Sequence, residues 1–125
     1  MNLGILRNAG INTFELMHTL MNNQDILITV LNKFLTDKNY EELKKAFSND
    51  NAKLDYKAIE VYAHTLKGTS ATLEMTELHL SLQKLVDDVR TEKYSMLKED
   101  FENVTVEYDK IINAILEWKV AEEIS

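Results

Sequence analysis

The sequence predicts an all-helical (all-α) fold: an up-and-down four-helix bundle with an additional short N-terminal helix. The 125-residue chain contains no proline and three glycines, and such scarce turn residues favour a few long helices over many short strands. Apolar residues recur in alternating steps of three and four, the spacing of helices that pack antiparallel at roughly 20°. This length suits one core, so we expect residues 1–125 to form a single domain.

Five helices are expected in chain order. The first covers about residues 13–20, and the second about 24–47, with a polar stretch at 36–39 that predicts a kink or an interruption. After a polar turn at 48–51, the third begins at Asp55, a good N-cap. The fourth covers 76–90 and the fifth about 97–118, each with an apolar stripe that includes, in the fifth, Tyr108 and Trp118.

The first helix carries apolar residues on two sides. Phe14, Met17 and Met21 form one stripe, while Leu16 and Leu20 lie roughly opposite. Two arrangements stay open: one face joins the core and the other is an exposed patch for a partner, or the helix is wedged between its neighbours and buries both faces.

Composition argues against several classes of function. A net charge of −7 without a lysine or arginine cluster does not suit nucleic-acid binding. Glycine-rich nucleotide loops are missing, so the chain is not expected to be a kinase. No apolar run reaches the ~20 residues of a membrane span, and no signal peptide is recognisable. Cysteine is absent, which suits a reducing compartment, and we expect a cytoplasmic location.

The third helix places a histidine on the side away from its core stripe. At roughly 100° per residue, the side opposite His64 consists of Tyr62, Leu66, Thr69 and Leu73. The residues within about 60° of His64 are Lys67, Gly68, Ala71 and Met75. We expect Ala71 and Met75 to belong to a partner-binding surface around the histidine.

The residues of this patch are better explained by the binding of an anion than by a contribution to the stability of the helix. Gly68 costs about 1 kcal/mol relative to alanine inside a helix, and Lys67 brings positive charge to an ionisable imidazole one turn away. A phosphoryl group explains both features, since a neutral imidazole is a competent nucleophile. Lys67 is placed to neutralise phosphoryl oxygens, and Gly68 with Ala71 leaves room for a partner's active site. We therefore predict that His64 accepts a phosphoryl group.

The run His-Thr-Leu-Lys-Gly-Thr-Ser at 64–70 resembles HxLKGxS, the signature of histidine-containing phosphotransfer (HPt) domains of two-component and phosphorelay signalling. The apolar segment 26–34, the pair Asp55-Tyr56, Ala63 and the terminal helix are also similar to that family. The resemblance implies that the histidine exchanges a phosphoryl group with an aspartate of a receiver domain. It implies no cofactor on this chain, with Mg²⁺ and most catalytic groups on the receiver.

Two positions depart from the family's pattern. Glu74 stands where glycine is usual, and Val86 stands where Gln or Glu often contacts the imidazole. These departures favour an alternative, a bundle that docks a receiver without carrying phosphate. In both interpretations the partner is a receiver domain of a response regulator or hybrid histidine kinase. Its docking patch is predicted at Leu16 and Leu20, beside His64, as a small transient interface on a monomer.

No second site is predicted. His18 and His79 lie on separate helices without paired ligands, so no metal site is expected. A plain structural or metal-binding bundle is a third alternative, which requires the histidine motif to be coincidental. Asp87-Asp88 is interpreted as part of an exposed helix face. From Met1 and the compact length we expect an independent protein or a separately expressed domain with similar limits, and excision from a larger hybrid kinase stays open.

Overall fold

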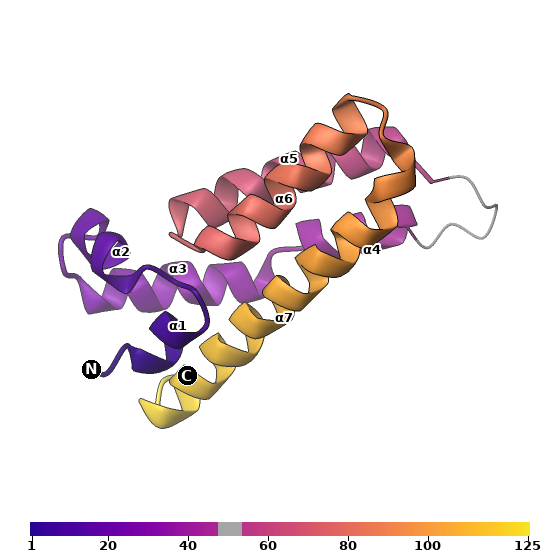
Figure 1. Cartoon of the computed structure of the whole chain (residues 1–125). Coiled ribbons are helices and arrows are strands. Elements are labelled where there is room, and N and C mark those ends of the chain that lie inside the picture. The colour runs from indigo at the N-terminus through magenta and orange to yellow at the C-terminus, as the bar shows by residue number, and fades with distance from the viewer. Residues whose placement is uncertain (48–53) are drawn as a thin grey trace.

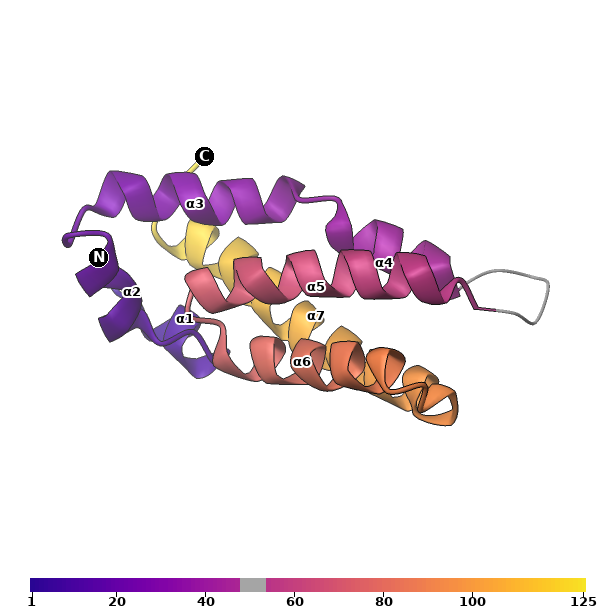
Figure 2. The ribbon, with the colours of Figure 1, turned by 90° about the horizontal axis from the view of Figure 1, so that it is seen from above.

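The computed structural model describes residues 1–47 and 54–125, which contain seven α-helices and one 3-10 helix. These elements are α1 (Gly4–Asn8), α2 (Thr13–Thr19), α3 (Gln24–Thr36), α4 (Asn39–Phe47), α5 (Tyr56–Thr72), α6 (Thr76–Arg90), η1 (Tyr94–Met96) and α7 (Leu97–Ala121). Helix α5 packs between α4 and α6, and α6 packs on α7. Figures 1 and 2 show α1 and α2 at the end of the bundle where α3 begins. The predicted all-helical bundle is confirmed.

Local sequence signals set most helix boundaries. The side chains of Asn12, Asn23 and Asp55 accept hydrogen bonds from backbone N–H groups in the first turns of α2, α3 and α5, as N-caps do. The predicted interruption of the second helix is confirmed, because α3 ends at Thr36 and α4 begins at Asn39. Helix α1 was not predicted, and the expected turn at 48–51 lies outside the described residues.

The end of α5 uses a left-handed C-terminal turn. Glu74 has φ +58°; its N–H donates to the carbonyl of Ala71 at 3.1 Å, and the N–H of Met75 donates to the carbonyl of Ser70 at 2.9 Å. These two bonds form a Schellman motif. The carbonyl of Glu74 also accepts a hydrogen bond from the N–H of Asn12 at 2.9 Å. The turn between α5 and α6 therefore anchors the start of α2.

The core lies between the helices, and the stripes expected on α6 and α7 face it. Their buried apolar residues include Leu78, Leu82, Leu85, Val89, Val104, Ile111, Ile115 and Trp118. On α5 the buried side is rotated from the predicted one: Ala63 and Ser70 are fully buried, whereas Tyr62 and Thr69 are half-buried. Two fully buried positions of α5 therefore carry small side chains. Within the described residues, no helix is both long and apolar enough to span a membrane.

Candidate functional site

His64 lies near the middle of α5, and its side chain is exposed. Ile59, Ala63 and Leu66 fix the helix from the inner side, where each is at most 1% exposed. Asp55 caps the first turn through a 3.1 Å hydrogen bond from the N–H of Ala58. The imidazole is therefore displayed to solvent on a helix whose opposite side is packed into the core.

The turn that carries Lys67 is held by contacts to its backbone. Its carbonyl accepts a hydrogen bond from the hydroxyl of Ser70 at 2.9 Å and one from Nδ1 of His79, on α6, at 3.2 Å. Because a carbonyl can only accept, the proton of the His79 ring lies on Nδ1. Lys67 follows His64 by three residues, so both side chains share one face of α5. His79 thus fixes the helix turn beneath the predicted phosphoryl contact.

Gly68 is not required by the packing of the chain itself. A Cβ atom at this position would meet no heavy atom within 4 Å. The residue borders a groove of about 490 Å³ between α3 and α5, which Val30 and Thr65 also line. Ala71, one turn further on, is exposed as well. The surface beside His64 is therefore open and hollowed.

Two residues predicted to contact a partner lie in the core instead. Leu16 is 1% exposed and Met75 is 0% exposed, so the prediction that they form an accessible surface is wrong. Met75 departs from the helical spacing of α5 because the helix ends at Thr72 and Glu74 has positive φ. Leu20 is half-buried and packs against the core.

Helix α2 does expose one apolar face, but it is the other one. Phe14 is 80% exposed, and so is Met21 at 87%, which follows the end of the helix at Thr19. Met17, on the same predicted stripe, is half-buried against the core, and Leu16 on the opposite stripe is buried. Of the two arrangements left open for this helix, the one with an exposed face holds at Phe14, on the side opposite Leu16, while Met17 is half-buried. The antiparallel bridge between Ile11 and Met75 explains the orientation, since it ties the chain just before α2 to the end of α5.

A cross-helix ion pair lies one turn before His64. The Nε atom of Arg90, on α6, donates to Oε2 of Glu60, on α5, at 2.8 Å. This hydrogen bond holds the pKa of Glu60 below its ordinary range. Helical spacing alone could have singled out Glu60, four residues before His64. It could not have revealed Arg90, which is 30 residues away along the chain.

The part of the chain that contains this site also matches the model of a known protein family. The family model described as Hpt domain matches residues 27–118, a span that includes His64 and all of α5 and α6. The chain belongs to the Hpt domain family. Hpt domains carry out histidine phosphotransfer in phosphorelay signalling and interact with receiver domains. No curated protein and no solved structure matches the chain.

The two departures of this Hpt domain have different physical consequences. Glu74 adopts the left-handed backbone conformation that glycine accommodates best, so its substitution concerns the end of α5 rather than the imidazole. Val86 is fully buried on α6. It supplies no hydrogen-bonding group to His64.

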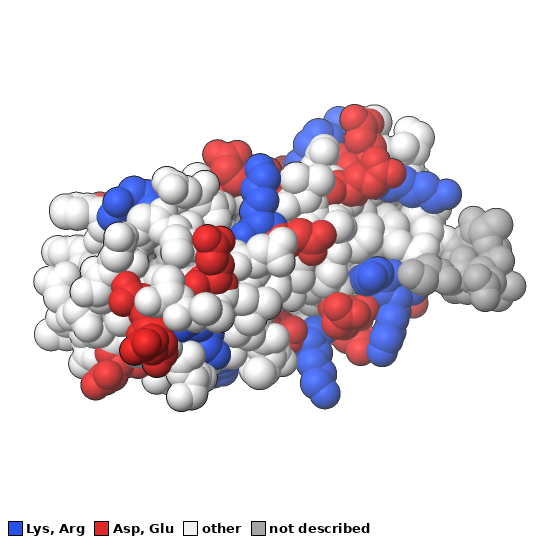
Figure 3. All heavy atoms as spheres, turned by 90° about the horizontal axis from the view of Figure 1, so that it is seen from below, with Lys and Arg blue, Asp and Glu red and all other residues white. Residues whose placement is uncertain are grey.

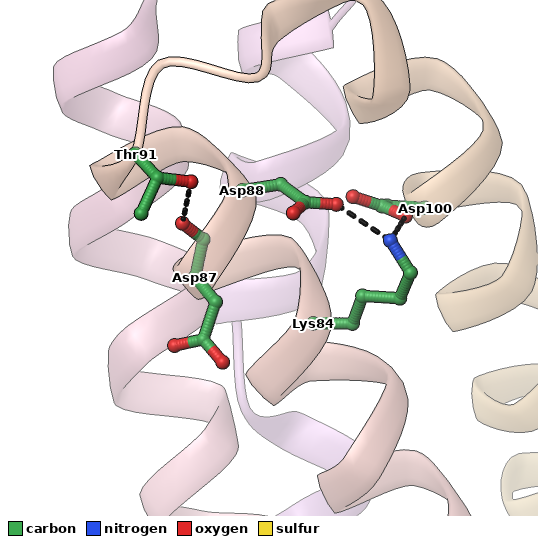
Figure 4. A network of polar contacts seen from close by, with 5 residues as sticks. All are labelled: Lys84, Asp87, Asp88, Thr91 and Asp100. Atoms are coloured by element: carbon green, nitrogen blue, oxygen red, sulfur yellow. Dashed lines mark hydrogen bonds and ion pairs between the residues drawn. The ribbon is translucent and has the colours of Figure 1, made fainter.

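A second group of charges in this Hpt domain joins α6 to α7. The Nζ atom of Lys84 lies 2.6 Å from a carboxylate oxygen of Asp88 and 3.1 Å from one of Asp100, and Figure 4 shows Lys84 between the two carboxylates. Asp88 is 6% exposed and Asp100 is 2% exposed, so the interpretation of Asp87-Asp88 as an exposed pair is wrong for Asp88 and holds for Asp87. Burial and the nearby Asp88 raise the pKa of Asp100 to about 6. Contacts with Asp100 and Lys84 lower the pKa of Asp88.

Other polar groups of the Hpt domain do not assemble into a further centre. Over residues 1–47 and 54–125, no three His, Asp or Glu side chains are grouped so as to hold a metal ion. His18 is exposed on α2, and His79 is bound to the carbonyl of Lys67. On the face drawn in Figure 3, lysine and arginine side chains are interspersed with acidic ones and form no continuous basic area.

Proposed function

We propose that this Hpt domain relays a phosphoryl group through His64, between receiver-domain aspartates or from a hybrid sensor kinase. One observation carries the proposal: an exposed histidine stands on a core-packed helix, beside a lysine and a glycine whose Cβ position is open. A relay needs a nucleophile that a partner's active site can reach, and it needs the nucleophile to be held still.

The roles of the neighbouring residues follow from the chemistry. A ring nitrogen of His64 attacks the phosphorus of an aspartyl phosphate, the N–P bond forms, and the P–O bond breaks with its electron pair leaving on the aspartate. Lys67 neutralises negative charge on the phosphoryl oxygens. Gly68 and Ala71 leave room for the receiver. This chain needs no cofactor of its own, and Mg²⁺ belongs to the receiver.

Phe14 of α2 and Met21, just after the end of this helix, are the proposed continuation of the docking surface. Phe14 and Met21 take the place of Leu16 and Leu20 in that role, because they are the apolar side chains that solvent reaches. Exposed apolar area of this kind is typical of surfaces that bind other proteins. A cytoplasmic location is part of the proposal and rests on the cysteine-free sequence.

A second candidate keeps the bundle and the receiver but not the phosphate. Val86 favours it, since a fully buried valine cannot orient the imidazole through a hydrogen bond. In that case receivers bind the chain while His64 stays unmodified.

Phosphoryl transfer from a phosphorylated receiver tests the proposal, with His64→Gln as the control. The relay predicts an acid-labile, alkali-stable label on the native chain and none on the variant. A receiver that binds the native chain but leaves it unlabelled would support the docking module instead. A label on both proteins would show that a residue other than His64 accepts the phosphoryl group.

A further inference from the structure

Glu60 places a carboxylate on the same face of α5 as His64. Its position is constrained, because Nε of Arg90 reaches it from α6 at 2.8 Å. Figure 2 shows α5 and α6 side by side, so this bond spans the contact between two packed helices. A surface glutamate would otherwise sample several rotamers. The ion pair restricts it to the side of α5 that faces α6.

The direction of helical side chains brings the imidazole toward this carboxylate. Residues four apart lie one above the other on a helix, and side chains lean toward the N-terminus. This tendency directs the ring of His64 toward the turn that contains Glu60, and the side chain of Lys67 toward the turn that contains His64. On this face of α5, an acidic residue therefore precedes His64 by one turn and a basic residue follows it by one turn.

Neither Val86 nor His79, both on α6, bonds to His64 in the structure. Val86 is apolar and fully buried, and the ring of His79 is bonded to the carbonyl of Lys67. Glu60 is instead an acceptor on the same helix as His64. The bond from Arg90 lowers the pKa of Glu60, so its carboxylate is ionised at neutral pH.

We propose that Glu60 is a positioning residue whose carboxylate accepts a hydrogen bond from Nδ1–H of His64, and that Arg90 fixes Glu60 for this role. The proposal rests on the proposed function of His64 as phosphoryl acceptor. A proton held on Nδ1 leaves the lone pair on Nε2, the nitrogen that faces a partner. Tautomer and ring orientation are selected by the same hydrogen bond.

The charges balance through the transfer step. When Nε2 forms its bond to phosphorus and the aspartate oxygen leaves with the electron pair, the ring keeps the proton on Nδ1 and becomes positively charged. The carboxylate of Glu60 stabilises that charge, while Lys67 contacts the phosphoryl oxygens. Arg90 offsets the negative charge of Glu60, which would otherwise repel the incoming phosphoryl group.

Nitrogen-15 NMR of the three histidines in the full chain tests the proposal without any transfer reaction. In the native chain, neutral His64 is expected to carry its proton mainly on Nδ1. Glu60→Ala is expected to shift the proton toward Nε2, whereas Glu60→Gln, which keeps an acceptor oxygen, is expected to retain the native tautomer. His79 serves as an internal reference bonded through Nδ1, and exposed His18 as a solvated one.

Single-turnover transfer from a phosphorylated receiver supplies the second readout. Glu60→Ala is expected to lower the maximal rate on the order of tenfold, the equivalent of one charge-assisted hydrogen bond, with the receiver concentration at half-maximal rate little changed. Glu117→Ala, an exposed glutamate of α7, is the matched control and should match the native rate.

The two readouts separate the failure of this inference from the failure of the relay. An identical His64 tautomer in the native chain and Glu60→Ala would overturn the role of Glu60, even if transfer proceeds. If no receiver phosphorylates the native chain, the relay itself is wrong, and the tautomer measurement still decides whether Glu60 orients the ring.

Discussion

Substitutions at Gly68 separate what the fold needs from what a partner needs. Glycine destabilises a helix interior by roughly 0.5–1 kcal/mol relative to alanine. Because an added Cβ would meet no atom within 4 Å, Gly68→Ala should recover that amount without strain. We expect the free energy of unfolding to rise by about 1 kcal/mol, or roughly 3–5 °C in Tm. Gly68→Gln should be similarly stable, since glutamine is also a good helix former.

The effect on phosphoryl transfer is expected to have the opposite sign. Glutamine at position 68 would project over the groove between α3 and α5, the side from which the proposed relay has a receiver approach His64. We expect Gly68→Gln to slow transfer by at least about tenfold, equivalent to 1.4 kcal/mol, and Gly68→Ala to slow it less. Ala121→Gln, at the exposed end of α7, introduces the same side chain away from the site and should transfer normally.

Two assays on the same proteins show whether Gly68 serves the fold or the approach of a partner. Urea unfolding followed by the fluorescence of buried Trp118 gives the stabilities, and single-turnover labelling by a phosphorylated receiver gives the rates. A destabilised Gly68→Ala would mean that the glycine serves the fold. Normal transfer by Gly68→Gln would mean that the partner does not pass over this residue, which would remove the clearance role.

Three further substitutions test other features. Glu74→Gly should stabilise the chain by about 1 kcal/mol because glycine tolerates positive φ. Glu117→Gly, inside α7, should destabilise it by about as much. If urea unfolding shows that both substitutions change the free energy of unfolding in the same direction, this explanation of Glu74 is wrong. Asp100 has a raised pKa, so its contribution to stability is complete below the unfolded value of 3.8 and is lost as pH rises through about 6. Between about pH 4 and pH 7 the native chain should therefore lose up to roughly 3 kcal/mol relative to Asp100→Asn, and parallel stability-versus-pH curves would refute this. Phe14→Ser should weaken receiver binding in calorimetry at least about threefold, with Tm unchanged, since a ring that is 80% exposed adds little to folding; unaltered affinity would exclude Phe14 from the docking surface.

The sequence was most informative where a structural feature depends on neighbouring residues. The bounds of α6 at Thr76 and Arg90 match the prediction, and Asp55 caps α5 as expected, because caps and apolar spacing are local signals. The orientation of α2 was not predictable in this way. Its two apolar stripes are nearly equivalent in sequence, and the choice between them depends on a bridge from Ile11 to Met75, which are 64 residues apart along the chain.

In the candidate site, too, the features that lie on one helix could be predicted and the contacts between helices could not. His64, Lys67 and Gly68 could be placed on one exposed face because they share one helix. Met75 could not, since the prediction extended the spacing of α5 past the left-handed turn at Glu74. The contact of His79 with the carbonyl of Lys67 joins different helices, and no local pattern encodes it.

The seven-residue motif at 64–70 combines two sets of residues because a helix turns once every 3.6 residues. Leu66 and Ser70 point inward, where they are 1% and 0% exposed, and the hydroxyl of Ser70 bonds to the carbonyl of Lys67. His64 and Gly68 are exposed. Substitution of an inward residue should therefore reduce stability before it alters transfer, while substitution of an outward residue should alter transfer with stability intact. In a motif of this kind, the residues that anchor the helix in the core alternate with the exposed nucleophile, so the packing of the motif itself fixes the position of His64.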